Sequence, residues 1–471
     1  GAAMIRCAAF GIRLSAVPLL RLAAAQPCAY RPGMASAPDH VITAEFSATV
    51  VRVDVEPDDR VEAGAPVLVL EAMPAFGGFL NPFRNSGYRF DTGLHYLGKL
   101  GDNGSMRLLL ELLEIDADVD FVELDPNGFD RYMFPDFELR LCKGSEQYHD
   151  RLLRLFPHES KALRKFFDLI DSLLKAFSDP HGPPKNLWDR LMYAYRHPVL
   201  MRYHRATYQQ MLKHITPNPQ LQAALSAHCG NSGLPPDLAS GFLCLMLLDH
   251  YMEGAYYPKG GSAALRDAMV AGIEKHSAVL KNRTPVTRIR RSGDEFIVHC
   301  ATGDTFSAKT VISNVDPLIA FSQLIDAALI PRSIKKKVSR LRPSAGAFYA
   351  FVGTSLDLTA FGFTDANRFH YEYTDVNRTM YAVEQRQTTD LFPYFMMTSP
   401  TLKDPHHRHA PEGRTTLEII TGLGYEHDFL PWAGTPSRRR GEAYEALKQK
   451  VGMSLIRSAE RYIPGLSDHL D

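Results

Sequence analysis

The sequence predicts an α/β fold with more than one domain, and three observations carry the prediction. An apolar run, Val67–Leu70, ends in an acidic residue, Glu71, as a buried strand with a ligand at its carboxyl end does. Residues 263–275 have the pattern of an amphipathic helix, and a hairpin pattern around Gly303 and a strand pattern at 311–314 follow. We expect 263–275 and 284–317 to share one sheet with 67–71, with the strand at 67–70 parallel to and near that at 311–314. Residues 106–240 are rich in helix patterns, with apolar residues at i, i+3 and i+4.

Composition excludes several classes of protein. The 471 residues include 53 basic and 53 acidic side chains, so no global field favours nucleic acid, and we expect no nucleic-acid partner. The six cysteines include no CxxC pair, which leaves no zinc or dithiol motif. No window reaches the ~20 apolar residues that span a bilayer. Peripheral contact with a membrane stays open.

The first 38 residues contain arginines and no acid, which is typical of an organelle transit peptide. Translated upstream sequence, with Met34 as the true start, explains the composition equally well. The location is therefore cytoplasmic or an organelle, with membrane association open.

Residues 39–73 predict short strands joined by an acidic turn at 56–59. Glu71-Ala72-Met73 resembles the Glu-Ala-Met-Lys-Met hairpin of a biotinyl carrier domain. Pro74 stands in place of the acceptor lysine and has no amine to acylate, so we expect no biotin.

Two later blocks indicate a different family. Gly77-Gly78 is followed by residues 87–95, Gly-Tyr-Arg-Phe-Asp-Thr-Gly-Leu-His, and residues 257–261 read Tyr-Pro-Lys-Gly-Gly. Together with a re-entry strand at 311–317, these blocks resemble the phytoene desaturase, carotenoid isomerase and retinol saturase group of FAD-dependent oxidoreductases over residues 67–471.

The resemblance implies a two-dinucleotide FAD-binding fold with a helix-rich substrate domain. The implied cofactor-binding residues are Glu71, Gly77, Gly78, Asp91, Gly93, Val286 and Asn314. The implied substrate-contacting residues are Tyr257, Pro258, Gly260 and Gly261. The implied FAD-binding domain is 74–105 with 245–325, and the implied substrate domain is 106–244 with 326–471. No catalytic residue and no metal ligand are implied.

One part of the family pattern is missing. The fold should open with a strand, GxGxxG and a helix whose N-terminus holds the pyrophosphate. The only Gly-x-Gly, Gly422-Leu423-Gly424, has no third glycine. We therefore expect FAD binding to be weak.

Three functions follow from these observations. The first is oxidation, reduction or isomerisation of a carotenoid or retinoid polyene by FAD. The second is a non-catalytic remnant that binds no flavin, and the third is an amine-oxidase-like flavoenzyme with a polar substrate. His406-His407-Arg408-His409 is not expected to bind metal, because no acid was identified at ligand spacing.

Overall fold

The computed structural model describes residues 49–53, 67–102, 104–179, 186–276, 278–341, 346–385, 391–423, 429–432, 435 and 439–471. Of residues 49–53 it describes the backbone alone. The leader expected at 1–38 and the acidic turn expected at 56–59 lie outside these residues.

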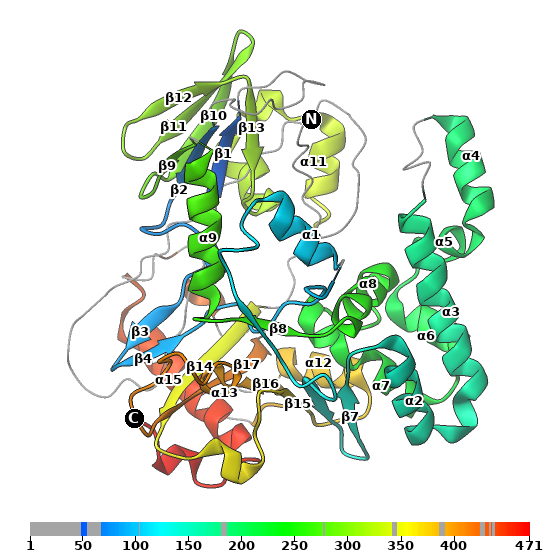
Figure 1. Cartoon of the computed structure of the whole chain (residues 1–471). Helices are drawn as coiled ribbons and strands as arrows, with labels where there is room; N and C mark the ends of the chain where they lie inside the picture. The colour runs from blue at the N-terminus through cyan, green and yellow to red at the C-terminus, as the bar shows by residue number, and fades with distance from the viewer. Residues whose placement is uncertain are drawn as a thin grey trace.

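A four-stranded sheet lies at the N-terminal side of the molecule, at the top of Figure 1. Its order is β13 (Thr310–Ser313), β1 (Thr49–Val53), β2 (Val67–Glu71) and β9 (Val279–Lys281). β2 and β13 are both antiparallel to β1 and hence parallel to each other, as the sequence predicts, with one strand between them. β9 is parallel to β2.

The direction of β1 departs from a dinucleotide-binding sheet. In that fold the first strand lies between the second and fourth strands and runs parallel to them. Here β1 occupies the place between β2 and β13 but runs antiparallel to both. The C-terminal end of β1 therefore lies at the opposite edge of the sheet from the carboxyl ends of β2 and β13, whereas in a dinucleotide-binding fold it lies at the same edge and leads into the pyrophosphate loop.

A second, three-stranded sheet follows. It consists of β10 (Val286–Ser292), β11 (Glu295–Cys300) and β12 (Thr305–Ala308), and its second hairpin turns at Gly303, as predicted. The expectation that all of 284–317 joins the sheet of β2 is wrong for β10, because β10 pairs with β11 instead.

The largest sheet has six strands in the order β14 (Gly346–Thr354), β17 (Thr415–Leu423), β16 (Tyr394–Thr398), β15 (Asn367–Tyr371), β6 (Asp130–Met133) and β7 (Glu138–Leu141). β15 and β6 are parallel, and the other neighbours are antiparallel. Two short pairs, β3 (Phe83–Asn85) with β4 (Tyr88–Phe90) and β5 (Phe121–Glu123) with β8 (Tyr256–Pro258), complete the strands described.

The helices form two groups along the chain, and only part of each group packs on the large sheet. The first group is α1 (Ser105–Leu112), α2 (Ser145–Leu155), α3 (Ser160–Phe177), α4 (Leu187–Arg196), α5 (Pro198–Tyr203), α6 (Tyr208–Ile215), α7 (Pro219–Ser226) and α8 (Gly241–Met252). The second group is α9 (Ser262–Lys275), α10 (Pro317–Ile319), α11 (Arg332–Val338), α12 (Val376–Gln385), α13 (Pro400–Lys403) and α15 (Gly441–Ala459). The helix-rich prediction for 106–240 is confirmed, although β5, β6 and β7 also lie there.

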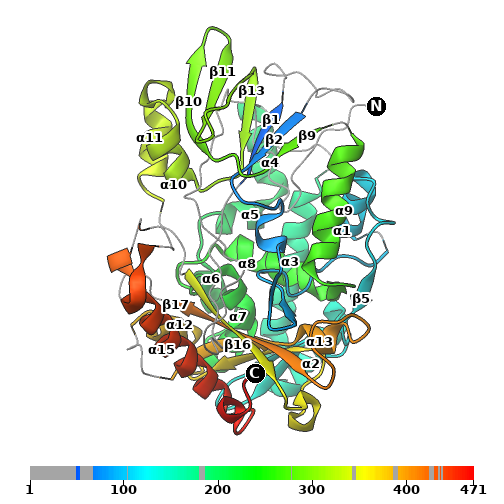
Figure 2. The same ribbon diagram turned by 90° about the vertical axis from the view of Figure 1, so that its left-hand side faces the viewer.

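Two apolar cores hold the sheet and helices together. One joins α2, α3, α6, α7 and α8 to β6, β7 and β15, and the other joins α15 to β14 and β17. α9 begins after β8 and runs up to the four-stranded sheet, as both views show (Figures 1 and 2). No described helix is long and apolar enough to cross a bilayer.

Candidate functional site

The N-terminus of α9 is built around Asp91, one of the residues implied to bind the cofactor. Asp91 is buried, and its carboxylate accepts hydrogen bonds from the Tyr257 hydroxyl, from Ser262 Oγ at 2.7 Å and from the Ser262 backbone N–H at 3.2 Å. Gly261, with φ of 75°, brings the backbone within reach of this carboxylate. Asp91 thus joins the first block of the family pattern to the second.

Glu418 extends this cluster toward a cavity. The Asp91 N–H donates to Glu418 Oε1 at 3.0 Å, and Glu418 Oε2 lies 3.2 Å from His95 Nδ1. Burial and the nearby Asp91 charge raise the pKa of Glu418 well above its usual range. Burial, with the nearby Lys403 charge, lowers the pKa of His95 to about 3. The imidazole is therefore neutral at physiological pH.

Lys403 fixes the backbone that carries His95. Its Nζ donates to the His95 carbonyl and to Asn367 Oδ1, both at 2.7 Å, and burial lowers its pKa to about 8. Asn367 in turn donates to Asp130 Oδ1 at 2.8 Å, and the Tyr96 hydroxyl donates to Asp130 Oδ2 at 2.8 Å. Two neighbouring wall residues of the cavity, His95 and Tyr96, are therefore held by one buried network.

A cavity of about 410 Å³ lies beside this network. Its wall combines segments from the loop after β4, α8, β14, α12, β15, β16 and β17. Aromatic and aliphatic side chains dominate the wall: Tyr96, Tyr251, Tyr349, Phe369, Met380, Val383, Tyr394, Met396 and Ile420. His95, Asn231, Ser232, Glu384 and Thr421 supply polar groups. Such a mostly apolar wall with few polar groups suits an apolar ligand that carries a polar end.

The structure brings only part of the predicted site to this cavity. Gly93 lines it, whereas the other residues implied by the resemblance do not. Tyr257, Pro258, Gly260 and Gly261 lie at the start of α9, where Gly260 N–H donates to Asp404 Oδ2 at 2.6 Å. Tyr257 is buried and hydrogen bonded to Asp91. Their assignment to the substrate stays a prediction.

The glycine pair lies between β2 and β3. Gly77 and Gly78 have φ of 110° and 51°, a backbone region that favours glycine. A Cβ on Gly77 would lie 2.6 Å from Arg266 Cγ on α9, and one on Gly93 would lie 2.9 Å from Phe79 Cβ. Contacts within the chain are therefore enough to require glycine at positions 77 and 93, and no ligand is needed to explain them. The contact of these glycines with FAD stays a prediction.

The remaining cofactor residues lie at the four-stranded sheet. Glu71 ends β2 fully buried, and its Oε1 accepts the Met73 N–H at 2.9 Å. Asn314 directly follows β13, and Val286 begins β10. Glu71 and Asn314 therefore lie at the carboxyl ends of the parallel strands β2 and β13, the edge at which a dinucleotide-binding fold holds adenosine. Val286 lies instead at the start of a strand in the three-stranded sheet. The contact of all three residues with FAD stays a prediction.

The residues present fit FAD at two places. Ser313 Oγ, beside Asn314, and His95 Nε2, two residues after Gly93, are buried and have no hydrogen-bond partner among the described residues. Unpaired buried polar atoms are costly, and a bound ligand would satisfy them. A flavin, once bound, supplies hydride transfer to or from a carbon–carbon bond. The pyrophosphate has no matching glycine loop in the sequence.

Sequence reasoning missed most of the cavity. Lys403, Asn367 and Asp130 are buried polar residues from distant parts of the chain, and no local motif joins them. Residues 394–398 and 415–423 show little alternation of apolar and polar residues, because these strands are buried on both faces. The sequence therefore does not indicate which of their side chains face the cavity.

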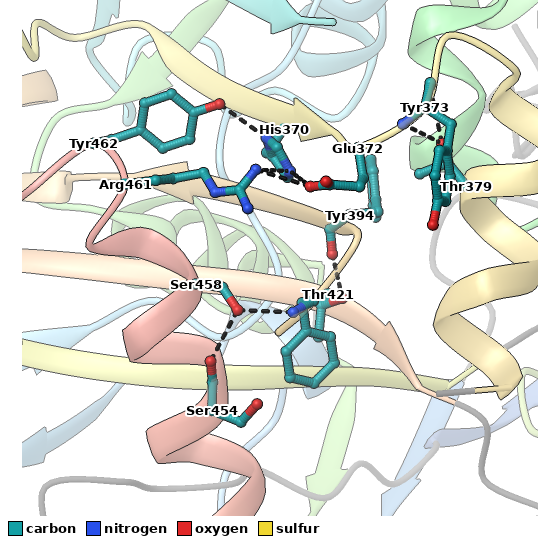
Figure 3. Close-up of polar contacts among 11 residues, drawn as sticks. His370, Glu372, Tyr373, Thr379, Tyr394, Thr421, Ser454, Ser458, Arg461 and Tyr462 are labelled. Atoms are coloured by element: carbon teal, nitrogen blue, oxygen red, sulfur yellow. Dashed lines mark hydrogen bonds and ion pairs between the residues drawn. The ribbon is translucent and has the colours of Figure 1, made fainter. Parts of the chain in front are cut away.

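On the face of β15 that points away from the cavity, the side chains hold the sheet to the segment after α15. In Figure 3, His370 lies between Tyr462 and the pair Glu372–Arg461, with Nδ1 2.8 Å from the Tyr462 hydroxyl and Nε2 2.9 Å from Arg461 Nη1. Burial lowers the pKa of His370 to about 4. This neutral imidazole attaches the segment after α15 to the sheet behind the cavity.

The histidine loop gives no metal site within the described residues. The statement that no acid lies near it is wrong, since Asp404 Oδ2 lies 2.8 Å from His407 Nδ1 and 3.6 Å from His409 Nε2. Asp404 also accepts the Gly260 N–H, so the loop is tied to the start of α9.

Comparison with known proteins agrees with this geometry. Residues 61–452 match the family "Flavin containing amine oxidoreductase". The chain is 26% identical to the all-trans-retinol 13,14-reductase of Danio rerio over 87% of this chain and 70% of that protein. It is 25% identical to an inactive all-trans-retinol 13,14-reductase of the same species, over 83% and 67%. It is 26% identical to prolycopene isomerase 1 of an Oncidium hybrid cultivar, over 86% and 67%.

Solved structures show the same fold. An oxidoreductase from Methanosarcina mazei superposes with a TM-score of 0.55 at 15% identity, over 84% of this chain and 78% of that one. A putrescine oxidase superposes with a TM-score of 0.53 at 13% identity, over 85% of this chain and 77% of that one. The predicted α/β class of the FAD-binding type is confirmed.

Proposed function

Because the chain belongs to the flavin containing amine oxidoreductase family, we propose that it is an FAD-dependent oxidoreductase whose substrate is an apolar polyene of the retinoid or carotenoid class. The observation that carries the substrate class is the cavity, whose wall is mostly aromatic and aliphatic and includes Gly93 from the first family block. Relatives named for retinol and prolycopene support it.

The chain's own residues have three tasks in this proposal. The aromatic wall, with Tyr349 and Phe369, excludes water and packs against the polyene. His95 and Tyr96, held by Lys403 and Asp130, form a fixed polar corner of the cavity. Saturation, desaturation and isomerisation all need this arrangement and differ in the redox state of the flavin.

The test uses the full chain loaded with FAD. We expect anaerobic incubation with reduced flavin to change the absorption spectrum of all-trans-retinol or of a cis-carotenoid. Loss of one double bond shifts the absorption to shorter wavelength, whereas isomerisation leaves the number of conjugated bonds unchanged. Absence of any flavin-dependent change with both substrate classes would contradict the proposal.

A cavity variant separates substrate from cofactor. Ile420→Trp narrows the cavity at β17 without touching the sheet of β2. We expect turnover at saturating FAD to fall at least about tenfold while the Kd for FAD stays unchanged, because overpacking excludes the substrate. A matching rise in the Kd for FAD would place the cofactor, not the substrate, at this wall.

A polar substrate is the second candidate. Several tyrosines and Glu384 line the cavity, and putrescine oxidase shares the fold. Peroxide release with putrescine or benzylamine, and none with polyenes, would favour it. The remnant alternative has the missing glycine loop and an inactive relative in its favour. A purified chain without flavin absorption, even after incubation with FAD, would select it.

A further inference from the structure

Helix α4 presents an apolar face that no described part of the molecule covers. Leu187, Trp188, Leu191 and Tyr195 are 73%, 69%, 57% and 81% exposed. At about 100° per residue, Trp188, Leu191 and Tyr195 fall within roughly 60° of one another around the helix axis, with Leu187 beside them. One side of this ten-residue helix is therefore a continuous apolar stripe.

The opposite side of α4 is attached to the protein. The Tyr193 hydroxyl donates to the Ala176 carbonyl on α3 at 2.9 Å, and Asp179 lies 3.0 Å from Arg196 and 2.7 Å from His197. Asn186 caps the helix, accepting the Asp189 N–H at 2.8 Å. The helix is thus held in place with its apolar stripe outward, at the outer edge of the helical region in Figure 1.

Basic residues lie close to the stripe in the sequence. Residues 187–205, covering α4 and α5, contain four arginines (Arg190, Arg196, Arg202 and Arg205) and one acid, Asp189. Arg190, Arg202 and Arg205 are exposed and belong to no described ion pair. Met201 on α5, 42% exposed, extends the apolar surface. The combination contrasts with the neutral charge of the whole chain.

We propose that the α4 face, defined as Leu187, Trp188, Leu191, Tyr195 and Met201 with the flanking arginines, docks on the surface of an anionic phospholipid bilayer. Trp and Tyr favour the boundary between headgroups and acyl chains, since each has an apolar ring and a polar group. Arginines beside an apolar helix face attract anionic headgroups. A bilayer also dissolves apolar polyenes, so docking there would supply the substrate; this last clause alone rests on the proposed function.

The binding test compares vesicles of phosphatidylcholine with vesicles that also contain phosphatidylserine, using the full chain and sedimentation. We expect binding to the mixed vesicles and much weaker binding to neutral ones. Trp188→Ser with Leu191→Ser should lower the partition coefficient at least about tenfold, because the change removes two large apolar side chains that would enter the bilayer. Arg190→Glu with Arg202→Glu should lower binding to the mixed vesicles only.

A matched control lies on α1. Leu108 and Leu112 are 51% and 58% exposed, so Leu108→Ser with Leu112→Ser removes similar apolar area elsewhere. This variant should bind vesicles like the unchanged chain. Equal loss in both variants, or full binding after the α4 changes, would overturn the proposal. Thermal unfolding of each variant checks that it is folded.

Self-association is the competing outcome. If the α4 face joins two copies of the chain, sedimentation velocity shows a dimer that the α4 variant loses, and vesicles capture neither protein; that result also overturns docking on lipid. Vesicle binding is measured without flavin or polyene. Failure of the proposed chemistry would therefore leave this result unaffected, and the two failures are distinguishable.

Discussion

At the scale of single residues, the cavity depends on charges that are kept out of water. Lys403, Glu418, Asp130 and Asp91 are all buried, and isolated buried charges are strongly unfavourable. Hydrogen bonds from Lys403 to His95 and Asn367, and the raised pKa of Glu418, offset that cost. These groups fix His95 and Tyr96 more firmly than apolar packing alone would.

Lys403 gives a prediction for pH dependence. Its pKa is about 8 in the folded chain and 10.5 in the unfolded one, so the unfolded chain binds more protons between these values. The contribution of Lys403 to the free energy of unfolding therefore rises as the pH increases from about 8 to 10.5. We expect the melting temperature of the unchanged chain to rise relative to that of Lys403→Met as the pH increases over this interval. A constant difference would show that the amine is not buried.

Gly78 gives a prediction for the cofactor. With φ of 51°, an alanine there is strained, and a Cβ would occupy space that the flavin is predicted to approach. Gly78→Ala should raise the Kd for FAD, measured by titration followed by flavin fluorescence. Gly303→Ala is the control, because its φ of 90° carries similar strain in a hairpin with open space around it. An unchanged Kd in Gly78→Ala would show that the assignment is wrong.

At the scale of elements, α9 depends on Asp91. The carboxylate at its N-terminus stabilises the helix dipole and accepts the hydrogen bonds of Ser262 and Tyr257. Asp91→Asn should lower the free energy of unfolding by about 1–3 kcal/mol, measured by urea denaturation. Asp294→Asn, in an exposed turn, should change it by less than about 0.5 kcal/mol. Similar losses in both would exclude a specific role for Asp91.

Local sequence patterns predict the elements that depend only on residues close together in the sequence. Val67–Glu71 is β2, and the helix expected at 263–275 is α9 with one more residue, Ser262, at its start. The hairpin at Gly303 also follows from turn chemistry. The pairing of β6 with β15 joins Asp130 to Asn367 across 237 residues, and nothing in either strand specifies the partner. The cavity is lined from this sheet, so its wall could not be predicted.

At the scale of the whole molecule, the predicted cofactor site has one part that follows the family sequence pattern and one part that departs from it. The glycine pair, Asp91 and Gly93 follow the family pattern, and Glu71 ends a buried strand as an adenosine-binding acid would. Between β2 and β13, strand β1 runs in the opposite direction to the first strand of a dinucleotide-binding fold. The family identifies FAD as the cofactor, whereas the structure departs from the family where the pyrophosphate is held.

The last prediction follows from that departure. Helix-end interactions with an anion contribute about 0.3–2 kcal/mol, and each hydrogen bond to a charged group about 1.5–3 kcal/mol. Without several of them, affinity falls by powers of ten, since 1.4 kcal/mol is about tenfold. Titration followed by flavin fluorescence should therefore give a Kd for FAD weaker than micromolar and within about tenfold of that for FMN, which lacks the adenylate half. Sub-micromolar FAD binding with a large preference over FMN would show that another segment holds the pyrophosphate, because only contacts to the adenylate half distinguish the two flavins.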